Sequence, residues 1–295
     1  MTSPKLALVG SEGFRNMTKP GPVQVIAVSG GKGGVGKTCV AVNLATAMAS
    51  SGKRVLLLDG DLGLANVDVL LGITPRYTLE HVLSGERTLD EIIVDTRQGF
   101  RVVPSASGVA QLASLTAAQH LALVQAFSTL AGRIDVLIVD TAAGIAEGVR
   151  QFCQAAQNIL LVIRDEPSSL TDAYALIKVL RRDHGVERFR VLANQTRRAG
   201  EGEALFRKLE RVTSRFLDVI VEYAGDVPED PYLRTAVREQ RPVLEAYPSS
   251  PAARAFRSLS QRVRDWPMPA GPRGNLEFFV ERLVGEPAAR LEAAR

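Results

Sequence analysis

The sequence predicts an α/β protein whose core is a doubly wound, mostly parallel sheet with helices on both faces. Short runs rich in Val, Ile and Leu alternate with longer stretches that have helical spacing. Runs that are apolar at nearly every position indicate strands buried on both faces, and parallel neighbours need helical crossovers between them. The expected strands are Val23–Ser29, Arg54–Leu58, Asp135–Val139, Asn158–Ile163 and Phe189–Ala193.

Both ends of the chain differ in composition from this α/β region. Residues 1–22 are polar, contain Gly and Pro, and lack apolar periodicity, so we expect a loose N-terminal arm before a domain over residues 23–265. Residues 266–274 read Trp-Pro-Met-Pro-Ala-Gly-Pro-Arg-Gly, which no helix or strand interior tolerates. They predict a linker to a C-terminal amphipathic helix and tail over residues 275–295.

Composition argues against several classes of protein. Of the 295 residues, 46% are hydrophobic and 23% charged, and no apolar run reaches the roughly 18–20 residues that span a bilayer, so we expect a cytoplasmic protein. The two cysteines, Cys39 and Cys153, form no Cys-X-X-Cys pair for zinc or an iron–sulfur cluster. The net charge is +4, and residues 181–295 carry all of this excess, with 21 basic and 17 acidic residues. By itself that excess is too small to indicate nucleic-acid binding.

A glycine-rich loop follows the first expected strand. Its sequence, Gly31-Lys32-Gly33-Gly34-Val35-Gly36-Lys37-Thr38, fits G-x-x-x-x-G-K-[ST] and precedes the helix-periodic Val40–Ala49. Such a loop points backbone N–H groups at phosphate oxygens, and the helix N-terminus adds the positive end of its dipole. We expect Lys37 to neutralise the β- and γ-phosphates and Thr38 to bind Mg²⁺, so the sequence predicts a P-loop for Mg²⁺ and ATP. Cys39, the next residue, belongs to the same predicted nucleotide-binding set.

A second lysine, Lys32, stands early in this loop. The pattern K-G-G-x-G-K-T resembles the deviant Walker A motif of the MinD/ParA family of ATPases. In that family the additional lysine reaches the nucleotide held by a second subunit. The resemblance therefore implies a homodimer formed with ATP, in which Lys32 and Lys37 both serve catalysis. A solvent-facing loop lysine is the alternative.

Three aspartates follow two of the expected strands. Asp59 and Asp61, in Leu58-Asp59-Gly60-Asp61, resemble the switch I segment of that family, and Asp140, followed by Thr141-Ala142-Ala143-Gly144, resembles Walker B and switch II. The resemblance implies that Asp59 and Asp140 support Mg²⁺ and its waters, while Asp61 orients or activates the attacking water. For each aspartate taken alone, a helix N-cap is the alternative.

Less specific matches concern the residues that, in this family, contact the base and the ribose of the nucleotide. Asn194 matches the asparagine that reads adenine in the family, and Val227 and Pro228 lie in a segment, Gly225-Asp226-Val227-Pro228-Glu229-Asp230, that resembles the loop closing over the base. Glu166 corresponds to a residue that contacts the ribose of the partner's nucleotide. Since such residues often follow buried strands as simple loop caps, that alternative stays open.

The C-terminal segment has an apolar helical face. Leu276, Phe279, Val280, Leu283 and Val284 follow i, i+3, i+4, i+7 and i+8 spacing, with Phe278 at the edge of the face. A helix of this kind after a linker resembles the membrane-targeting sequence of MinD-like ATPases, which implies peripheral membrane contact through residues 275–284. A helix packed on its own domain is the alternative, because the polar face has few Lys and Arg residues.

Within the family, the sequence most resembles the flagellar-number regulators of the FlhG/FleN type. The similar stretches lie between about Val23 and Val284, and they include Gly63–Gly72, Asp140–Gly144 and Thr171–Lys178. MinD proteins instead have Ser-Pro-Ala-Gly after the Walker B aspartate. The resemblance implies a slow, switch-type ATPase that limits flagellar number by restraining a sigma-54-dependent flagellar transcription activator, alongside a signal-recognition-particle-like flagellar GTPase.

Direct sequence-specific binding of nucleic acid is not expected from this resemblance. Three alternatives remain: a MinD-like ATPase of the division site, a DNA-segregation protein, and a metabolic ATP-using ligase on the same fold. Rapid substrate turnover would favour the ligase, whereas ATP-dependent dimerisation with slow hydrolysis would favour the switch.

Overall fold

A computed structural model describes residues 23–105, 116–267 and 278–279 of the chain. Its centre is an eight-stranded sheet in the order β3-β4-β2-β5-β1-β6-β7-β8. All neighbouring strands pair in parallel except β3 and β4. The predicted doubly wound, mostly parallel sheet is therefore confirmed. The strands are β1 (Gln24–Ser29), β2 (Val55–Gly60), β3 (Val94–Asp95), β4 (Arg101–Val103), β5 (Val136–Thr141), β6 (Asn158–Ile163), β7 (Arg188–Thr196) and β8 (Ile220–Pro228).

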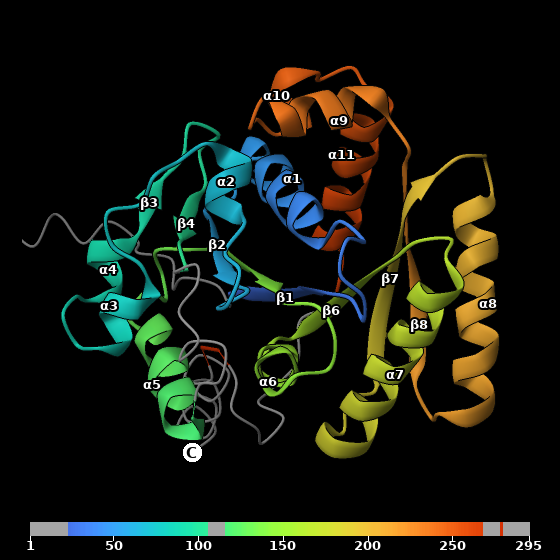
Figure 1. Cartoon of the computed structure of the whole chain (residues 1–295), viewed down its shortest axis with the longest axis horizontal. Coiled ribbons are helices and arrows are strands. Elements are labelled where there is room, and N and C mark those ends of the chain that lie inside the picture. Colours follow the sequence, from blue (N-terminus) through green and yellow to red (C-terminus); the bar gives the residue numbers. More distant parts are fainter. Residues whose placement is uncertain (1–22, 106–115, 268–277, 280–295) are drawn as a thin grey trace, which may run out of the picture.

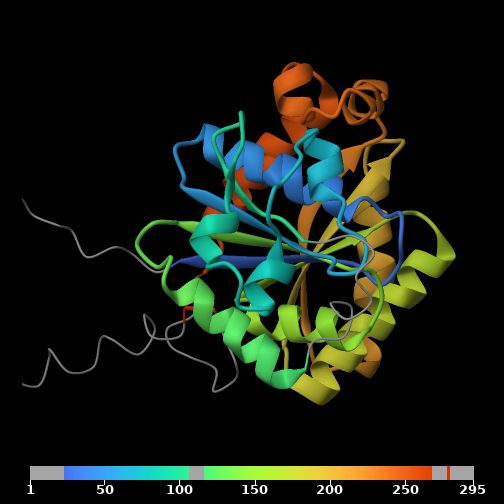
Figure 2. The same ribbon diagram turned by 60° about the vertical axis from the view of Figure 1, so that its left-hand side comes forward.

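Helices cover both faces of the sheet (Figures 1 and 2). Along β1, Val25 and Ala27 belong to one buried cluster, whereas Ile26 and Val28 belong to the other, as the alternation of strand side chains requires. The first cluster includes side chains of α3 (Leu79–Leu83), α4 (Leu89–Ile92), α5 (Ala117–Ser128), α6 (Glu147–Ala155), α7 (Pro167–His184) and α8 (Glu201–Phe216). The second includes α1 (Lys37–Ser50), α2 (Val67–Leu71), α9 (Pro231–Arg238), α10 (Val243–Ala246) and α11 (Pro251–Arg264).

The five expected strands are all present, but three further strands were missed. β3 and β4 are two and three residues long, too short to give a periodic signal. β8 lies at the edge of the sheet, and its residues are buried to different degrees. The segment Gly225–Pro228, which we expected to be a loop over the base, belongs to this strand, because β8 pairs with β7 as far as Pro228. Only Glu229 and Asp230 lie between β8 and α9.

Most of the two terminal segments lies outside the described residues, including residues 1–22 and most of the predicted linker and tail. Phe278 and Phe279 are described, and they lie in a turn with Phe279 at φ 59°, outside the right-handed helical region. Both side chains are buried in the first cluster, Phe278 with a ring centroid 5.3 Å from that of Phe127. Among the described helices, none has the length and apolar character needed to cross a membrane.

Candidate nucleotide site

The P-loop joins β1 to α1 at the carboxyl edge of the sheet, and close packing explains two of its glycines. A Cβ atom on Gly31 would clash with the backbone of Asp172 in α7. A Cβ atom on Gly36, which has φ 96°, would clash with Nδ2 of Asn194 in β7. Helix α1 begins at Lys37, so the first N–H groups of the helix, which lack intrahelical partners, face the loop. This is the geometry that a phosphate group requires.

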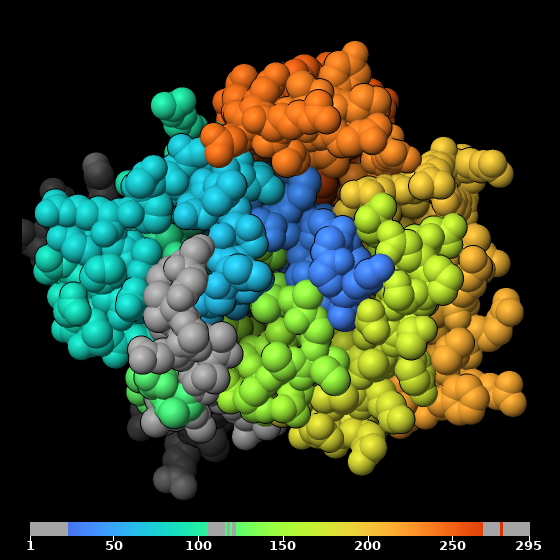
Figure 3. Space-filling model, in the orientation of Figure 1, coloured from blue at the N-terminus to red at the C-terminus, as the bar shows by residue number. Residues whose placement is uncertain are grey.

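A pocket of about 730 Å³ opens at this loop. In Figure 3 the P-loop and the start of α1, coloured blue, are exposed near the middle of the face, between α2 in cyan and α7 in yellow-green. The predicted residues Gly33, Gly34, Gly36, Lys37, Thr38, Cys39 and Asp61 all line the pocket, together with Leu64, Asn66, Val69, Leu70, Thr141, Ala143, Val237, Arg238 and Gln240. The structure thus brings together most of the predicted phosphate-binding set and adds residues of α2 and α9 that the sequence did not indicate.

Two of the predicted aspartates lie side by side on neighbouring strands. Asp59 of β2 and Asp140 of β5 are partners in the parallel register, and both are about 1% exposed. Burial, and next the charge of Asp59, raises the pKa of Asp140 to about 8. Burial likewise raises the pKa of Asp59 to about 7, although three backbone N–H groups, from Asp61, Asn66 and Val67, donate to its carboxylate. The pair therefore holds protons that a nearby cation would displace.

These residues fit a magnesium ion. Oδ1 of Asp140 is buried without a hydrogen-bond partner in the described part of the chain, while the Thr38 side chain hydrogen-bonds the same carboxylate. Oxygen ligands of this kind suit Mg²⁺, which keeps several waters and binds through one or two carboxylates and the phosphates. Among the described residues there is no cluster of three or more His, Cys, Asp or Glu side chains that could hold a metal ion.

Lys37 lies close to these carboxylates and is itself buried, with 8% of its surface exposed. Burial lowers the pKa of Lys37, and the negative charges of Asp140 and Asp61 oppose that effect. Asp61, by contrast, is half-buried at the mouth of the pocket, where its carboxylate accepts the backbone N–H of Leu64 at 3.2 Å. Asp61 is thus placed where a side chain could contact water beside a bound phosphate.

Lys32, the second lysine of the loop, is bound within its own chain. Its Nζ donates to Oε2 of Glu166 at 2.7 Å and to Oγ of Ser168 at 2.8 Å. The hydrogen bond from Lys32 lowers the pKa of Glu166, and Arg164 also contacts this carboxylate at 3.4 Å. Arg164 donates to the carbonyl of Gly34 in the P-loop at 3.4 Å as well, a contact that sequence reasoning missed. The two residues predicted to contact a partner's nucleotide therefore contact each other in the single chain.

Asn194 lies against the P-loop rather than in open solvent. Its Nδ2 donates to the carbonyl of Val35 at 2.8 Å, and the residue is 4% exposed. Asn194 is also the register partner of Val227, and Thr196 that of Pro228. The structure thus places Asn194, Val227 and Pro228 together near the ends of β7 and β8, but none of the three lines the pocket at the P-loop, and Val227 is fully buried in the second cluster.

Three comparisons with known proteins agree with this geometry. Residues 23–186 match a family model described as an AAA domain. The chain is 57% identical over 275 residues to "Antiactivator FleN" of Pseudomonas aeruginosa, which covers 93% of this chain and 98% of that protein. It is 31% identical to "Flagellum site-determining protein YlxH" of Helicobacter pylori, covering 78% of each.

This chain belongs to the MinD/ParA family of ATPases. Among solved structures, the cell division ATPase MinD of Pyrococcus furiosus superposes with a TM-score of 0.69 at 28% identity, covering 82% of this chain and 98% of that one. MinD of Pyrococcus horikoshii, solved with Mg-ADP, gives the same TM-score at 27% identity, covering 82% and 96%. Within the family, the chain is most similar to the FleN/FlhG branch, as the sequence predicted.

Proposed function

We propose that this protein is an ATP-dependent, dimerising switch that limits flagellar number by restraining a sigma-54-dependent flagellar transcription activator. The main support is the 57% identity to an antiactivator, because the alignment covers 93% of this chain and 98% of that protein. The P-loop, the paired carboxylates Asp59 and Asp140, and Asp61 at the pocket mouth supply what an ATPase of this type needs.

In this proposal, different residues of the chain bind the phosphates, the metal ion, the attacking water and the base. Lys37 and the first N–H groups of α1 would bind and orient the phosphates, and Thr38, Asp59 and Asp140 would hold Mg²⁺ and its waters. The ion would neutralise charge on the phosphates. Asp61 positions the attacking water. Asn194, with Val227 and Pro228, would contact the base.

Dimerisation in this proposal depends on Lys32. Lys32 leaves Glu166 and Ser168 of its own chain and reaches the nucleotide of the second copy, while Glu166 becomes available to contact the partner's ribose. The ion pair between Lys32 and Glu166 is exposed on both sides, with about 38% and 36% of the side chains accessible. Exchanging such a pair for new partners has a small net cost, because surface ion pairs contribute about 0–1 kcal/mol.

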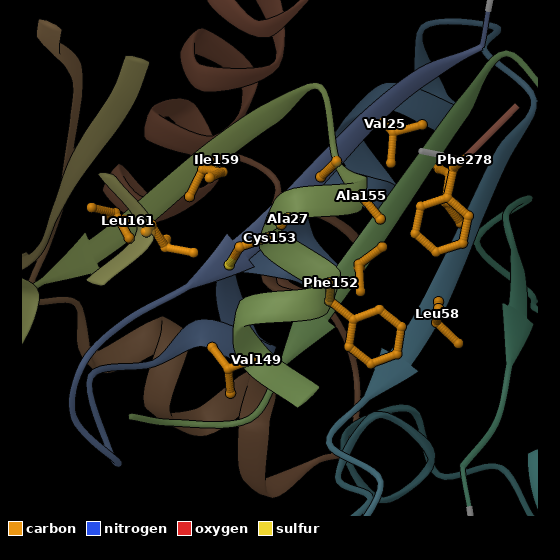
Figure 4. Packing of buried hydrophobic residues seen from close by; sticks show 14 of the residues in the cluster. Val25, Ala27, Leu58, Val149, Phe152, Cys153, Ala155, Ile159, Leu161 and Phe278 are labelled. Carbon is orange, nitrogen blue, oxygen red and sulfur yellow. The ribbon is translucent and has the colours of Figure 1, made fainter. Parts of the chain in front are cut away.

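The C-terminal segment would add a membrane contact. Phe278 donates its backbone N–H to the carbonyl of Ala155 at 3.2 Å, and its ring lies near Phe152 and Leu58 in the first cluster (Figure 4). Helix α6, which ends at Ala155, begins at Glu147, only seven residues after Asp140. We therefore propose that Phe278 and Phe279, which are buried in the single chain, are released when ATP binds, so that residues 275–284 become available for peripheral membrane contact.

A reconstituted transcription assay tests the proposed function. With purified activator, sigma-54 polymerase and a flagellar promoter, the protein with Mg-ATP should reduce transcript formation, and with ADP it should not. The signal-recognition-particle-like flagellar GTPase can be added as a second partner. If the protein leaves the activator unaffected but binds a division-site inhibitor with ATP, the MinD-like alternative is correct.

A further inference from the structure

The turn that joins α9 to α10, residues 239–242, contains a glutamine in an unusual backbone conformation. Gln240 has φ 54°, in the left-handed region, and its N–H donates to the carbonyl of Val237 at 3.1 Å, which closes the end of α9. Glycine is the usual residue at such a helix end, because a Cβ atom disfavours positive φ. Helices α2 and α7 end in that way, at Gly72 and Gly185. A glutamine held in this conformation points to a role for its side chain.

The side chain of Gln240 reaches α2. Its Nε2 donates to the carbonyl of Val69, in the last turn of that helix, at 2.8 Å. The packing is also close, because a Cβ atom on Gly72, the C-cap of α2, would lie 3.3 Å from Cβ and 3.4 Å from Oε1 of Gln240. Gln240 and Val69 are 171 residues apart in the sequence, and both line the nucleotide pocket. The contact therefore joins two walls of that pocket.

The turn that carries Gln240 is itself attached to the P-loop helix. Directly after the turn, the backbone N–H of Val243 donates to Oδ1 of Asn43 in α1 at 2.9 Å. Nδ2 of Asn43 donates in turn to the carbonyl of Cys39, in the first turn of α1, at 2.8 Å. Val243 is also buried in the second cluster. These contacts fix the position of the turn relative to the P-loop.

Helix α2 is thus held at both ends. At its start, the Asp59 carboxylate accepts the backbone N–H groups of Asn66 and Val67 at 3.0 and 3.1 Å. At its end, the amide of Gln240 holds the last turn. Asp61 lies in the segment between Asp59 and α2. The place of the Asp61 carboxylate in the pocket therefore depends on where α2 lies.

We propose that Gln240 is a positioning residue for ATP hydrolysis. Its amide holds α2 against the turn between α9 and α10, and so keeps the Asp61 carboxylate where it orients the attacking water. This inference rests on the proposed function, in which Asp61 has that role. Gln240 acts through α2 and needs no contact with the nucleotide. Its loss should slow the chemical step and leave the affinity for ATP unchanged.

Phosphate release at saturating Mg-ATP, together with calorimetric measurement of the Kd for ATP, tests the proposal on the full chain. In Gln240→Ala, kcat should fall about 2- to 10-fold, which is the effect of losing one neutral hydrogen bond, while Kd stays unchanged. In Asp61→Ala/Gln240→Ala, kcat should equal that of Asp61→Ala alone, because the group to be positioned is absent. A residue that only supports the fold would lower the rate again.

A second substitution, Gln240→Gly, separates the amide from the stability of the turn. Glycine lacks the amide but suits φ 54°, so this variant should unfold at a higher temperature than Gln240→Ala and yet hydrolyse ATP just as slowly. The matched control is Gln98→Ala. It removes an amide hydrogen bond to Glu245 of α10 instead of one to α2, and it should hydrolyse ATP at the parental rate.

Parental kcat in Gln240→Ala would overturn the inference, and so would recovered hydrolysis in Gln240→Gly or a further loss in the double variant. Light scattering should still detect the ATP-dependent dimer of Gln240→Ala, since a lost dimer would mean that Gln240 acts on association and not on Asp61. If Asp61→Ala itself hydrolyses ATP at the parental rate, the proposed role of Asp61 fails, and the inference fails with it.

Discussion

Burial of the carboxylate pair Asp59 and Asp140 should have two consequences: protons are released when Mg-ATP binds, and the protein without metal loses stability at high pH. The variant Asp140→Asn tests both. The pKa of Asp140 is raised to about 8 and that of Asp59 to about 7, in each case mainly by burial. At pH 7 the two neighbouring carboxylates therefore still hold protons between them. Mg²⁺ binds the ionised carboxylates, so binding of Mg-ATP at pH 7 should release on the order of one proton from the pair, in addition to those from the nucleotide.

Isothermal titration calorimetry in buffers with different ionisation enthalpies measures this proton release. The parent should release more protons than Asp140→Asn, and the affinity of the parent for Mg-ATP should rise between pH 6 and pH 8. In the variant, Mg²⁺ should raise nucleotide affinity less than in the parent, because Thr38 and Asp59 remain but one carboxylate is lost. Proton release that is equal in parent and variant, together with a flat pH profile, would refute the assignment of Asp140 as a support for the metal.

Without metal, the stability of the folded parent should fall as pH rises, whereas its affinity for Mg-ATP should rise. The raised pKa of Asp140 means that the folded chain holds a proton which the unfolded chain loses near pH 4, so this stabilisation is complete below pH 4 and is lost as pH rises through about 8. Asn cannot ionise, so Asp140→Asn should be the more stable protein at pH 8. Each unit by which folding raises the pKa of Asp140 lowers the free energy of unfolding of the parent at pH 8 by about 1.4 kcal/mol. A gain of that size in Asp140→Asn raises Tm by about 3–6 °C in a domain of this size.

Asp135→Asn, at the start of the same strand region, is the control for this measurement. Asp135 accepts hydrogen bonds from Arg54, which lower its pKa. Its contribution to stability is therefore present at neutral pH and is lost as pH falls. Asp135→Asn should not gain stability at pH 8. A gain equal to that of Asp140→Asn would show that burial of the Asp140 carboxylate is not the cause of the effect.

Three further predictions concern the switch and the tail. Lys32→Ala should bind Mg-ATP as a monomer and lose the ATP-dependent dimer, which light scattering measures. A dimer that persists would show that Lys32 does not link the two copies through the nucleotide. Asp61→Ala should bind ATP and still dimerise while hydrolysis falls by about two or more orders of magnitude, measured as phosphate release, because a water-orienting group is lost; hydrolysis at the parental rate would show that the assignment is wrong. Phe278→Ala should lower the free energy of unfolding by about 3–5 kcal/mol without nucleotide, because the ring is fully buried against Phe127, and chemical denaturation measures the loss.

Local patterns in the sequence were sufficient to predict the five central strands of the sheet and the glycine-rich loop between β1 and α1. β1 is apolar at nearly every position because both faces are covered, and the P-loop glycines and lysines lie within eight consecutive residues. β8 was missed because an edge strand is buried to different degrees along its length. Contacts between distant parts of the chain could not be predicted: Lys32 and Glu166 are 134 residues apart, and Arg164 gives no pattern that connects it to Gly34.

Exposed apolar side chains surround the mouth of the nucleotide pocket, where they could couple nucleotide binding to the proposed dimerisation. Leu64, Val69 and Val237 line the pocket with 69%, 59% and 40% of their surface exposed, and Ile145, which follows the Asp140 segment, is 48% exposed. Burying such a side chain fully contributes about 1.5–3 kcal/mol. Asp59 accepts hydrogen bonds from the backbone N–H groups of Asn66 and Val67 at the start of α2. A cation beside Asp59 would change the strength of these hydrogen bonds. They hold the segment that carries Leu64 and Val69. A coupling free energy of only about 1–3 kcal/mol between the two events changes affinity by roughly 5- to 150-fold. In the proposed dimer, a second copy of the chain would cover these exposed apolar side chains around the pocket.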